Sequence, residues 1–336
     1  MQGKYPLTTT VGSYPTPLWL QSFSTKDNLL DAILVVLKTQ ELAGIDLLVD
    51  GELHRWNINH AATNGMIDYF VRPMSGIQTD FTRKDFEDFR NQSGMAYRVE
   101  PAGIAFDQIG PGTLNLLRDY ELVRGLTQRP LKFTITSPYM LARVLVNKYY
   151  NTFQDLVFAI AEVLAEQLTG VDADVIQVDE ANLTGSPENA EIAAAGINRV
   201  FEDAPNQKAV HLCFGNYGGQ TVQQGTYKHL IDFINGLSCD HVVLEMARRP
   251  ESDKQILREV KPEMDIGIGV IDIKDNQVET PDEVAQRIED AAQICGQERL
   301  RYVHPDWGLW MLQRSVADAK MRALVKGRDL FVGGKN

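Results

Sequence analysis

The chain has few cysteines, no membrane-length apolar run, no apolar leader and a shortage of positive charge. Its three cysteines, at positions 213, 239 and 295, form no paired framework, so we expect a reducing compartment, the cytoplasm. The missing apolar segments argue against a signal peptide and against membrane insertion. The 33 Lys and Arg against 45 Asp and Glu give a formal net charge of −12, which disfavours nucleic acid and anionic lipid as partners.

What the sequence does contain is an alternation of short β-like runs and longer amphipathic stretches. Strands are predicted at 7–12, 45–50, 132–136, 175–179, 210–214, 241–246, 266–271 and 301–304. Helices are predicted at 28–42, 152–168, 189–202, 226–235 and 280–295. About eight βα units favour an α/β fold of the (β/α)8 TIM-barrel type. A doubly wound sheet is the second interpretation, but no Gly-x-Gly-x-x-Gly motif follows an early strand to support it.

We interpret residues 1–336 as one barrel domain. Residues 72–129 are rich in charge, glycine, proline and aromatics and have weak periodicity. They are predicted to be an insertion, or a long βα connection, packed over one mouth of the barrel.

Three side chains near the ends of predicted strands have the chemistry of a metal site. His211 and Cys213 are two residues apart on one strand and so share a face. Glu245 stands where the next strand-like run ends. Imidazole, thiolate and carboxylate are zinc ligands, so the three predict a Zn2+ site, although a buried cysteine and an ordinary polar histidine are the simpler reading of His-x-Cys alone.

Other polar residues also follow the predicted strands, where the chemistry of a barrel belongs. They are Ser13, Asp50, Glu52, His54, Arg55, Asp179, Glu180, Asp272, Lys274, His304 and Asp306. One such acid alone is usually a helix cap or a solvated group. Together with His211, Cys213 and Glu245, these residues mark seven strand ends, which predicts an active site that binds a metal or an amine.

Seven stretches of the chain resemble the catalytic barrel of the cobalamin-independent methionine synthase family, in the family's order. They are Thr8-Thr-Thr-Val-Gly-Ser-Tyr-Pro15, Leu48-Val-Asp-Gly-Glu52, Ile176-Gln-Val-Asp-Glu180, His211-Leu-Cys213, Leu244-Glu245, Gly269-Val-Ile-Asp272 and Pro305-Asp-Trp-Gly308. The chain has the length of about one such barrel, like the short, core type of methionine synthase and related zinc alkyltransferases.

The resemblance implies roles for individual residues. It implies His211, Cys213 and Glu245 as ligands of Zn2+. It implies that Val11, Gly12 and Ser13, together with Glu52 and Asp179, bind an amino-acid thiol, with the two carboxylates holding its ammonium group. The implied reaction is zinc-dependent methyl or alkyl transfer to a thiol such as homocysteine, giving methionine or a related thioether.

Three positions depart from the family pattern. Trp307 replaces a cysteine that is the fourth zinc ligand in the family, which should weaken zinc binding; His304 is a conceivable substitute ligand. Lys274 stands where the family has its general-acid histidine, so we predict Lys274, with Asp272 of the same segment, as catalytic. The tryptophan that stacks on folate in the family aligns near Val144, which favours a corrinoid methyl donor over folate.

Two alternatives remain beside the transferase. One is a metal-independent lyase or decarboxylase on the same superfamily barrel, although the arginine-rich N-terminal motif of the uroporphyrinogen group is missing. The other is a metal-free binding protein. The predicted partners are a small-molecule thiol and a corrinoid methyl donor, and a homo-oligomer is allowed because such assemblies are common.

Overall fold

A parallel β-sheet curled around a central axis organises the molecule. The computed structural model describes residues 5–55, 64–91, 98, 100–217, 220–221 and 225–334. The main sheet has the strand order β1 (Leu7–Thr8), β12 (Leu300–Pro305), β11 (Asp265–Ile271), β10 (His241–Leu244), β7 (Gln207–Leu212), β6 (Val175–Glu180) and β4 (Lys132–Thr136). Every neighbouring pair in this sheet is parallel.

A short extended segment completes the ring between the edge strands β1 and β4. Thr9 forms a parallel bridge with Leu47, and Leu48 forms one with Leu131. The backbone N–H of Lys132 donates to the Leu48 carbonyl at 2.8 Å. The second predicted strand is therefore present only as two bridges. With it, the seven strands form the predicted eight-membered (β/α)8 barrel.

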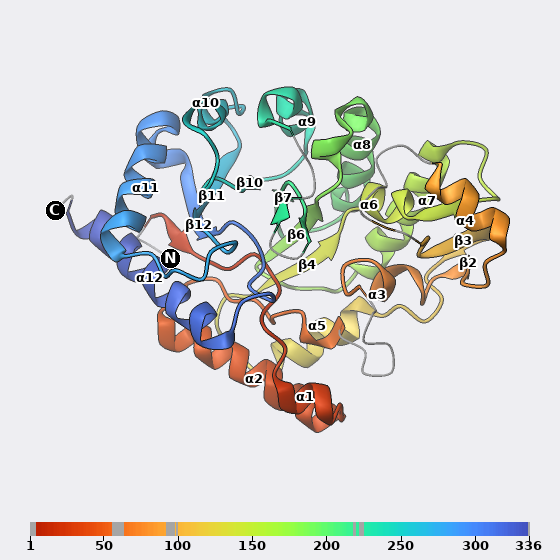
Figure 1. Cartoon of the computed structure of the whole chain (residues 1–336), viewed down its shortest axis with the longest axis horizontal. Helices are drawn as coiled ribbons and strands as arrows, with labels where there is room; N and C mark the ends of the chain where they lie inside the picture. Colours follow the sequence, from red (N-terminus) through yellow and green to blue (C-terminus); the bar gives the residue numbers. More distant parts are fainter. Residues whose placement is uncertain are drawn as a thin grey trace.

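Helices lie around the outside of the sheet, as Figure 1 shows. They are α1 (Leu18–Ser22), α2 (Lys26–Ala43), α3 (Asp68–Val71), α4 (Arg83–Arg90), α5 (Leu116–Arg124), α6 (Pro138–Arg143), α7 (Phe153–Gln167), α8 (Ala190–Phe201), α9 (Ile231–Gly236), α10 (Glu251–Lys254), α11 (Pro281–Cys295) and α12 (Arg314–Gly333). The strands are buried on both faces, as expected when helices cover a parallel sheet from outside.

The inside of the barrel has an apolar floor and a polar upper part. The floor is a small cluster with members from separate strands: Leu7, Leu47, Val175, Ala209, Val243 and Tyr302. Two residues beyond Val175 on β6 the inward side chain is the buried Gln177, and the inward side chains of β4, Lys132 and Thr134, are polar and buried. The apolar floor closes one end of the barrel, and the polar groups gather toward the C-terminal ends of the strands.

A second, smaller sheet lies beside the barrel. It contains β2 (Ser75–Gln78), β3 (Gly103–Gly110) and β5 (Leu145–Asn147), with β2 antiparallel to β3 and β3 parallel to β5. In Figure 1, β2, β3 and α4 lie together at one edge of the molecule. The segment 72–129 thus supplies β2, α4, β3 and α5, while β5 comes from beyond it. Its interpretation as an insertion within a single domain stays a prediction.

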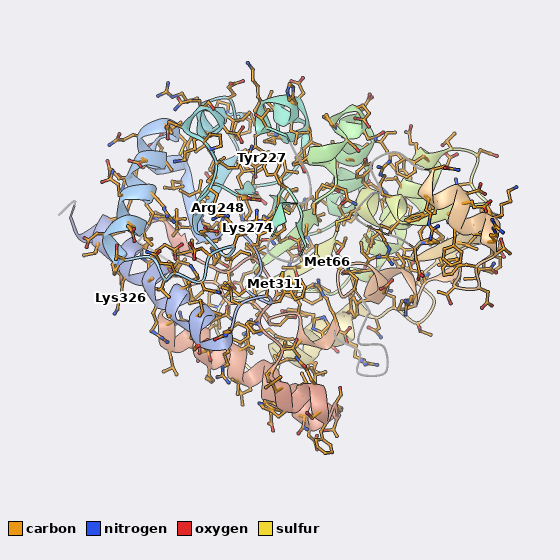
Figure 2. The ribbon with its side chains drawn as sticks, viewed as in Figure 1. Met66, Tyr227, Arg248, Lys274, Met311 and Lys326 are labelled. Carbon is orange, nitrogen blue, oxygen red and sulfur yellow. The ribbon has the colours of Figure 1, made fainter. Side chains whose placement is uncertain are left out.

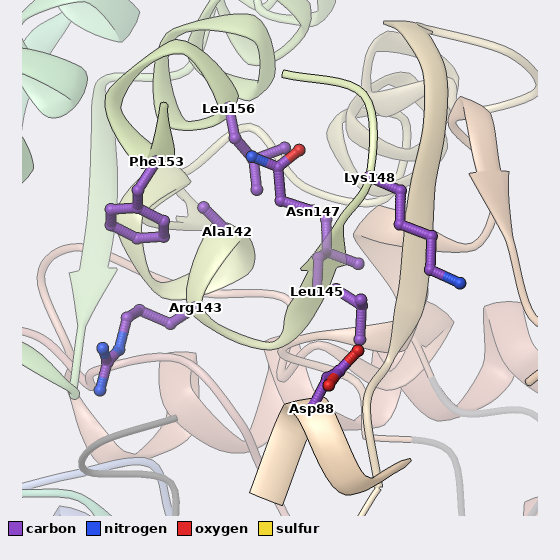
Figure 3. A pocket seen from close by; sticks show the side chains of 9 residues that line it. Asp88, Ala142, Arg143, Leu145, Asn147, Lys148, Phe153 and Leu156 are labelled. Carbon is purple, nitrogen blue, oxygen red and sulfur yellow. The ribbon is translucent and has the colours of Figure 1, made fainter. Parts of the chain in front are cut away.

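A cavity of about 440 Å3 lies between this small sheet and helices α4, α6 and α7 (Figure 3). Its lining includes Arg143, Asn147, Lys148 and Phe153 and none of the predicted site residues.

A two-stranded ribbon, β8 (Asn216–Tyr217) and β9 (Gln220–Thr221), follows β7. Within the described ranges, no helix combines the length and the apolar character needed to cross a bilayer.

Candidate active site

The predicted metal ligands lie on adjacent strands at one end of the barrel. Leu212 at the end of β7 pairs in register with Leu244 at the end of β10. Cys213 and Glu245 directly follow these partners, so they are neighbours at the C-terminal mouth. The backbone N–H of Phe214 donates to Glu245 Oε2 at 3.4 Å, and both Cys213 and Glu245 are buried.

His211 is held with one ring nitrogen fixed by the backbone. Its Nδ1 lies 3.1 Å from the Val243 carbonyl oxygen, which favours the tautomer that leaves Nε2 as an acceptor. Burial, and then His304, lower the pKa of His211 to about 3, so the ring is neutral at pH 7. Burial raises the pKa of the Cys213 thiol well above its ordinary value. A neutral imidazole oriented by a backbone carbonyl is the form in which histidine binds metals.

Glu245 has a cation as its partner. Lys274 Nζ lies 3.0 Å from Glu245 Oε1, and both side chains are almost fully buried. The same ammonium group lies 4.9 Å from the centroid of the Trp307 ring, within the range of a cation–π interaction. Lys274 lies near the middle of the ring of helices in Figure 2. Lys274 and Trp307, which both depart from the family pattern, therefore interact through the Lys274 ammonium group.

These contacts test whether zinc fits the site. The donor set suits zinc in kind, because imidazole, thiol and carboxylate lie at one mouth. Among the residues that the structure describes, however, no three such side chains come together in an arrangement ready for a metal ion. The reason is visible at Glu245, whose carboxylate holds Lys274 instead. His304, the substitute ligand considered from sequence, is fully buried with Nδ1 2.8 Å from the Pro305 carbonyl oxygen.

Glu52 lies on the other side of the mouth in an unusual backbone conformation. Its φ of 59° makes it the one non-glycine residue with positive φ among those described. Such left-handed residues cluster at functional sites. Its carboxylate accepts a hydrogen bond from Thr134 Oγ1 at 2.7 Å and lies 3.3 Å from the Arg55 guanidinium. A Cβ atom on Gly12 would lie 2.2 Å from Glu52 Oε1, so the carboxylate packs directly against the loop after β1.

Asp179 is buried near the end of β6 and accepts a hydrogen bond from Gln177 Nε2 at 2.7 Å. Burial, and then the Glu52 carboxylate, raise the pKa of Asp179 above its ordinary value. The two carboxylates accept hydrogen bonds from Thr134 and Gln177, which are register partners on the adjacent strands β4 and β6, so the two acids lie near each other at the mouth. An ammonium group bound between them would relieve their repulsion and favour the charged form of both.

The segment 305–308 ties the strand ends together. Asp306 Oδ1 accepts hydrogen bonds from the backbone N–H groups of Met246 and Ala247, each at 2.9 Å. A Cβ atom on Gly308 would lie 2.0 Å from Ser13 Oγ, and the Leu309 N–H donates to the Ser13 carbonyl at 2.7 Å. This segment therefore fixes both the chain after Glu245 and the loop that contains Ser13.

Asp272 faces a different set of partners from Lys274. Its carboxylate pairs with Arg248 Nε at 2.7 Å and accepts the Lys274 backbone N–H at 2.8 Å. Its own N–H donates to Glu279 at 2.7 Å. Arg248 also lies near the middle of the molecule in Figure 2. Asp272 therefore shapes the loop from which the Lys274 side chain reaches Glu245.

The structure brings the predicted site residues to one mouth and adds residues that sequence reasoning missed. Lys132, Thr134 and Gln177 connect the predicted carboxylates to the barrel wall. The available signal was the alternation of polar residues in Lys132-Phe-Thr-Ile-Thr136, which puts Lys132, Thr134 and Thr136 on one face of a strand. In a closed barrel that face points inward.

Fold and site together define an α/β-barrel enzyme whose chemistry lies at the C-terminal mouth. Residues 5–328 match the family model described as the catalytic domain of cobalamin-independent synthase. The chain therefore belongs to the cobalamin-independent synthase family, and it is a methyltransferase of the methionine-synthase kind.

Individual relatives cover nearly the whole chain. A methionine synthase from Thermococcus kodakarensis is 28% identical, over 96% of this chain and 92% of its own. One from Sulfurisphaera tokodaii is 27% identical, over 96% and 91%. Among solved structures, a B12-independent methionine synthase from a Shewanella species, described in complex with selenomethionine, has a TM-score of 0.81 at 22% identity over 99% of both chains. The last likeness supports the barrel fold.

The family membership corrects one prediction. A corrinoid methyl donor was expected because Val144 stands where the family has a tryptophan. The matching family is described as cobalamin-independent, so this expectation was wrong. The Val144 side chain is buried in the apolar core and gives no evidence for a corrinoid site.

Proposed function

We propose that this protein transfers a methyl group to the thiol of homocysteine, giving methionine, with Zn2+ held by His211, Cys213 and Glu245. The observation that carries the proposal is the meeting of two groups of residues at one barrel mouth. One is the His-Cys-Glu set on β7 and β10. The other is the carboxylate pair of Glu52 and Asp179, beside Gly12.

The amino-acid end of the substrate fits the second group. The backbone and hydroxyl of Val11, Gly12 and Ser13 bind its carboxylate end, and Glu52 and Asp179 hold its ammonium group. These roles rest on the close packing of Glu52 against Gly12 and on the hydrogen bonds that hold the two carboxylates against adjacent strands. Family membership favours this transferase over the lyase and the metal-free binding protein considered from sequence.

The thiol end lies toward His211, Cys213 and Glu245. Zinc, when bound, would lower the pKa of the substrate thiol, so that a thiolate is available at neutral pH. Binding requires that Glu245 exchange Lys274 for the metal. For the methyl donor we propose a tertiary amine such as a methylated folate. Lys274, oriented by the Asp272 loop, would then be placed to donate a proton to the donor nitrogen as its bond to the methyl group breaks and the sulfur–methyl bond forms.

The location and assembly remain part of the proposal. The three thiols that the sequence contains are all free in the structure, Cys213 and Cys295 buried and Cys239 partly so. Free thiols support a reducing compartment, and we propose the cytoplasm. A homo-oligomer remains an expectation.

The test is a metal and activity assay on matched cysteine variants. Cys213→Ser removes the thiolate and should lower zinc affinity at least about 10- to 100-fold, measured by chelator competition, and abolish methionine formation from homocysteine. Cys239→Ser, away from the site, is the control and should keep both properties. Zinc-loaded wild type that forms no methionine with a methylated folate, or a Cys213→Ser variant that keeps wild-type zinc affinity, would contradict the proposal.

A further inference from the structure

A buried lysine inside the barrel has no part in the chemistry described above. Lys132 is 2% exposed and lies on the inward face of β4. Its ammonium group donates to the Thr10 carbonyl at 2.6 Å and to Gln177 Oε1 at 2.7 Å. A charged lysine is almost never fully buried without partners that justify it. Lys132 therefore links the segment that follows β1, at Thr10, to β6, at Gln177.

Gln177 passes this interaction on to the proposed substrate site. Its Nε2 donates to the Val11 carbonyl at 3.0 Å and to Asp179 Oδ1 at 2.7 Å. An unbroken series of hydrogen bonds thus runs from Lys132 through the Gln177 amide to Asp179. The same amide and ammonium groups fix the two carbonyls that precede Gly12.

Lys132 fixes the orientation of the Gln177 amide together with the acceptors Val11 and Asp179. An ammonium group has donors and no acceptor, so the Gln177 oxygen must face Lys132. The amide nitrogen then has to face Asp179 and Val11. Without the ammonium group, the buried Gln177 oxygen loses its donor, so the amide is held less firmly and its hydrogen bonds to Asp179 and the Val11 carbonyl weaken.

We propose that Lys132 is a positioning residue for recognition of the substrate's α-amino group: through Gln177 it fixes the Asp179 carboxylate and the Val11 carbonyl in the arrangement that receives an ammonium ion. This inference rests on the proposed function, because it takes the substrate to be an amino acid. It adds that binding of the substrate's ammonium end, and not of its thiol end, depends on Lys132. Lys132 and Gln177 lie beneath Asp179 in the barrel, and neither needs to touch the substrate.

The electrostatics of the barrel interior agree with this role. Burial lowers the pKa of Lys132, and Asp179 and Glu52 act in the opposite direction. The Arg55 guanidinium lies 3.3 Å from the Glu52 carboxylate and pairs with it, whereas Asp179 meets Lys132 only through the Gln177 amide. A bound ammonium ion beside Asp179 favours the charged form of this carboxylate, and a ligand without an amino group does not.

The experiment compares two ligands that differ only in the amino group, homocysteine and 4-mercaptobutanoate. Their dissociation constants are measured by calorimetry on wild type, Lys132→Met and Gln177→Glu. Lys132→Met removes the charge at similar side-chain length. Gln177→Glu keeps the shape and the contact with Lys132 but replaces the donor to Asp179 with an acceptor. Thermal unfolding of each variant checks that it folds.

Both variants should bind homocysteine about 10- to 100-fold more weakly than wild type, the range expected for loss of one hydrogen bond to a charged group. Both should bind 4-mercaptobutanoate with a dissociation constant within about twofold of the wild-type value. An equal loss for both ligands in folded variants would make Lys132 a purely structural residue and overturn the proposal. If Lys132→Met does not fold, the isosteric Gln177→Glu decides alone by the same criterion. Equal binding of the two ligands by wild type would overturn both the ammonium pocket and this inference. A failure of methyl transfer with the preference for homocysteine intact would instead contradict only the proposed reaction.

Discussion

At the scale of single residues, Glu245 has two alternative partners, the ammonium group of Lys274 and the proposed metal ion. The ammonium group of Lys274 satisfies the buried carboxylate while no metal is bound, at 3.0 Å from Glu245 Oε1. A buried carboxylate without any cation would be costly, so this pairing is what makes the metal-free fold acceptable. Trp307 covers the ammonium group with its ring and keeps it in place. The replacements of a histidine and a cysteine in the family pattern are therefore physically linked.

We predict from this competition that Lys274→Met increases zinc affinity. The variant frees the Glu245 carboxylate and removes a positive charge beside the metal position, so the dissociation constant for zinc should fall by roughly 10-fold, a typical effect of a group next to a metal ligand. Methyl transfer should fall at the same time, because the proposed proton donor is lost. Chelator competition measures the first effect. Lys326→Met, an exposed residue of α12, is the control and should bind zinc as wild type does.

An unchanged or weaker zinc affinity in Lys274→Met would contradict this competition. It would mean that Glu245 does not take part in metal binding, and that the zinc ligands have to be sought elsewhere at the mouth.

At the scale of elements, the helices α11 and α12 approach each other through a glycine. A Cβ atom on Gly327 would lie 2.4 Å from Val284 Cβ, closer than side-chain atoms pack. Gly327→Ala should therefore destabilise the fold by about 1–3 kcal/mol in chemical denaturation, because overpacking outweighs the gain in helix propensity. Gly333→Ala, in the same helix and with no neighbour within 4 Å of its Cβ position, should be neutral or slightly stabilising. Equal effects of the two changes would show that the helices separate without cost.

The elements predicted from sequence are those whose local pattern is strong. The strand predicted at 132–136 matches β4, and the helix predicted at 280–295 matches α11 within one residue. The helix predicted at 226–235 begins instead as a 3₁₀ turn at Tyr227–Leu230 and becomes α9. The long α12 was not predicted, although it buries nine of its residues, including Lys320 and Arg328. Charged side chains on its inner face hide the amphipathic pattern that marks a helix.

The part of the site that depends on residue type could be predicted from the sequence. The part that depends on contacts between distant residues could not. His211, Cys213 and Glu245 were recognisable from their chemistry at strand ends, and the register of β7 and β10 brings Cys213 beside Glu245. The ion pair of Glu245 with Lys274 joins residues 29 positions apart, and the bond from Lys132 to Gln177 joins residues 45 positions apart. Local pattern carries no information about such pairs, because closure of the barrel creates them.

At the scale of the whole molecule, the barrel buries several histidines in a neutral state. Burial lowers the pKa of His211 and His241 to about 3 and that of His54 and His304 to about 4. His241 is the clearest to test, because it lies on β10 below the mouth, with its ring centroid 4.7 Å from that of Tyr302. Buried acids such as Asp179 have raised pKa values and act in the opposite direction, so only a single-site comparison isolates one histidine.

We predict that His241→Phe makes the fold less sensitive to acid. The unfolded chain takes up a proton on His241 as the pH falls through 6.5, whereas the folded protein does not until about pH 3. Wild type therefore loses stability relative to the variant by about 1.4 kcal/mol per pH unit between pH 6.5 and the folded pKa. Urea unfolding of both proteins at pH 7, 6, 5 and 4 measures the difference. His229→Phe, at an exposed position, should follow wild type throughout. A stability difference between wild type and His241→Phe that stays constant with pH would mean that His241 takes up its proton equally well in the folded barrel, and the neutral interior inferred for it would be wrong.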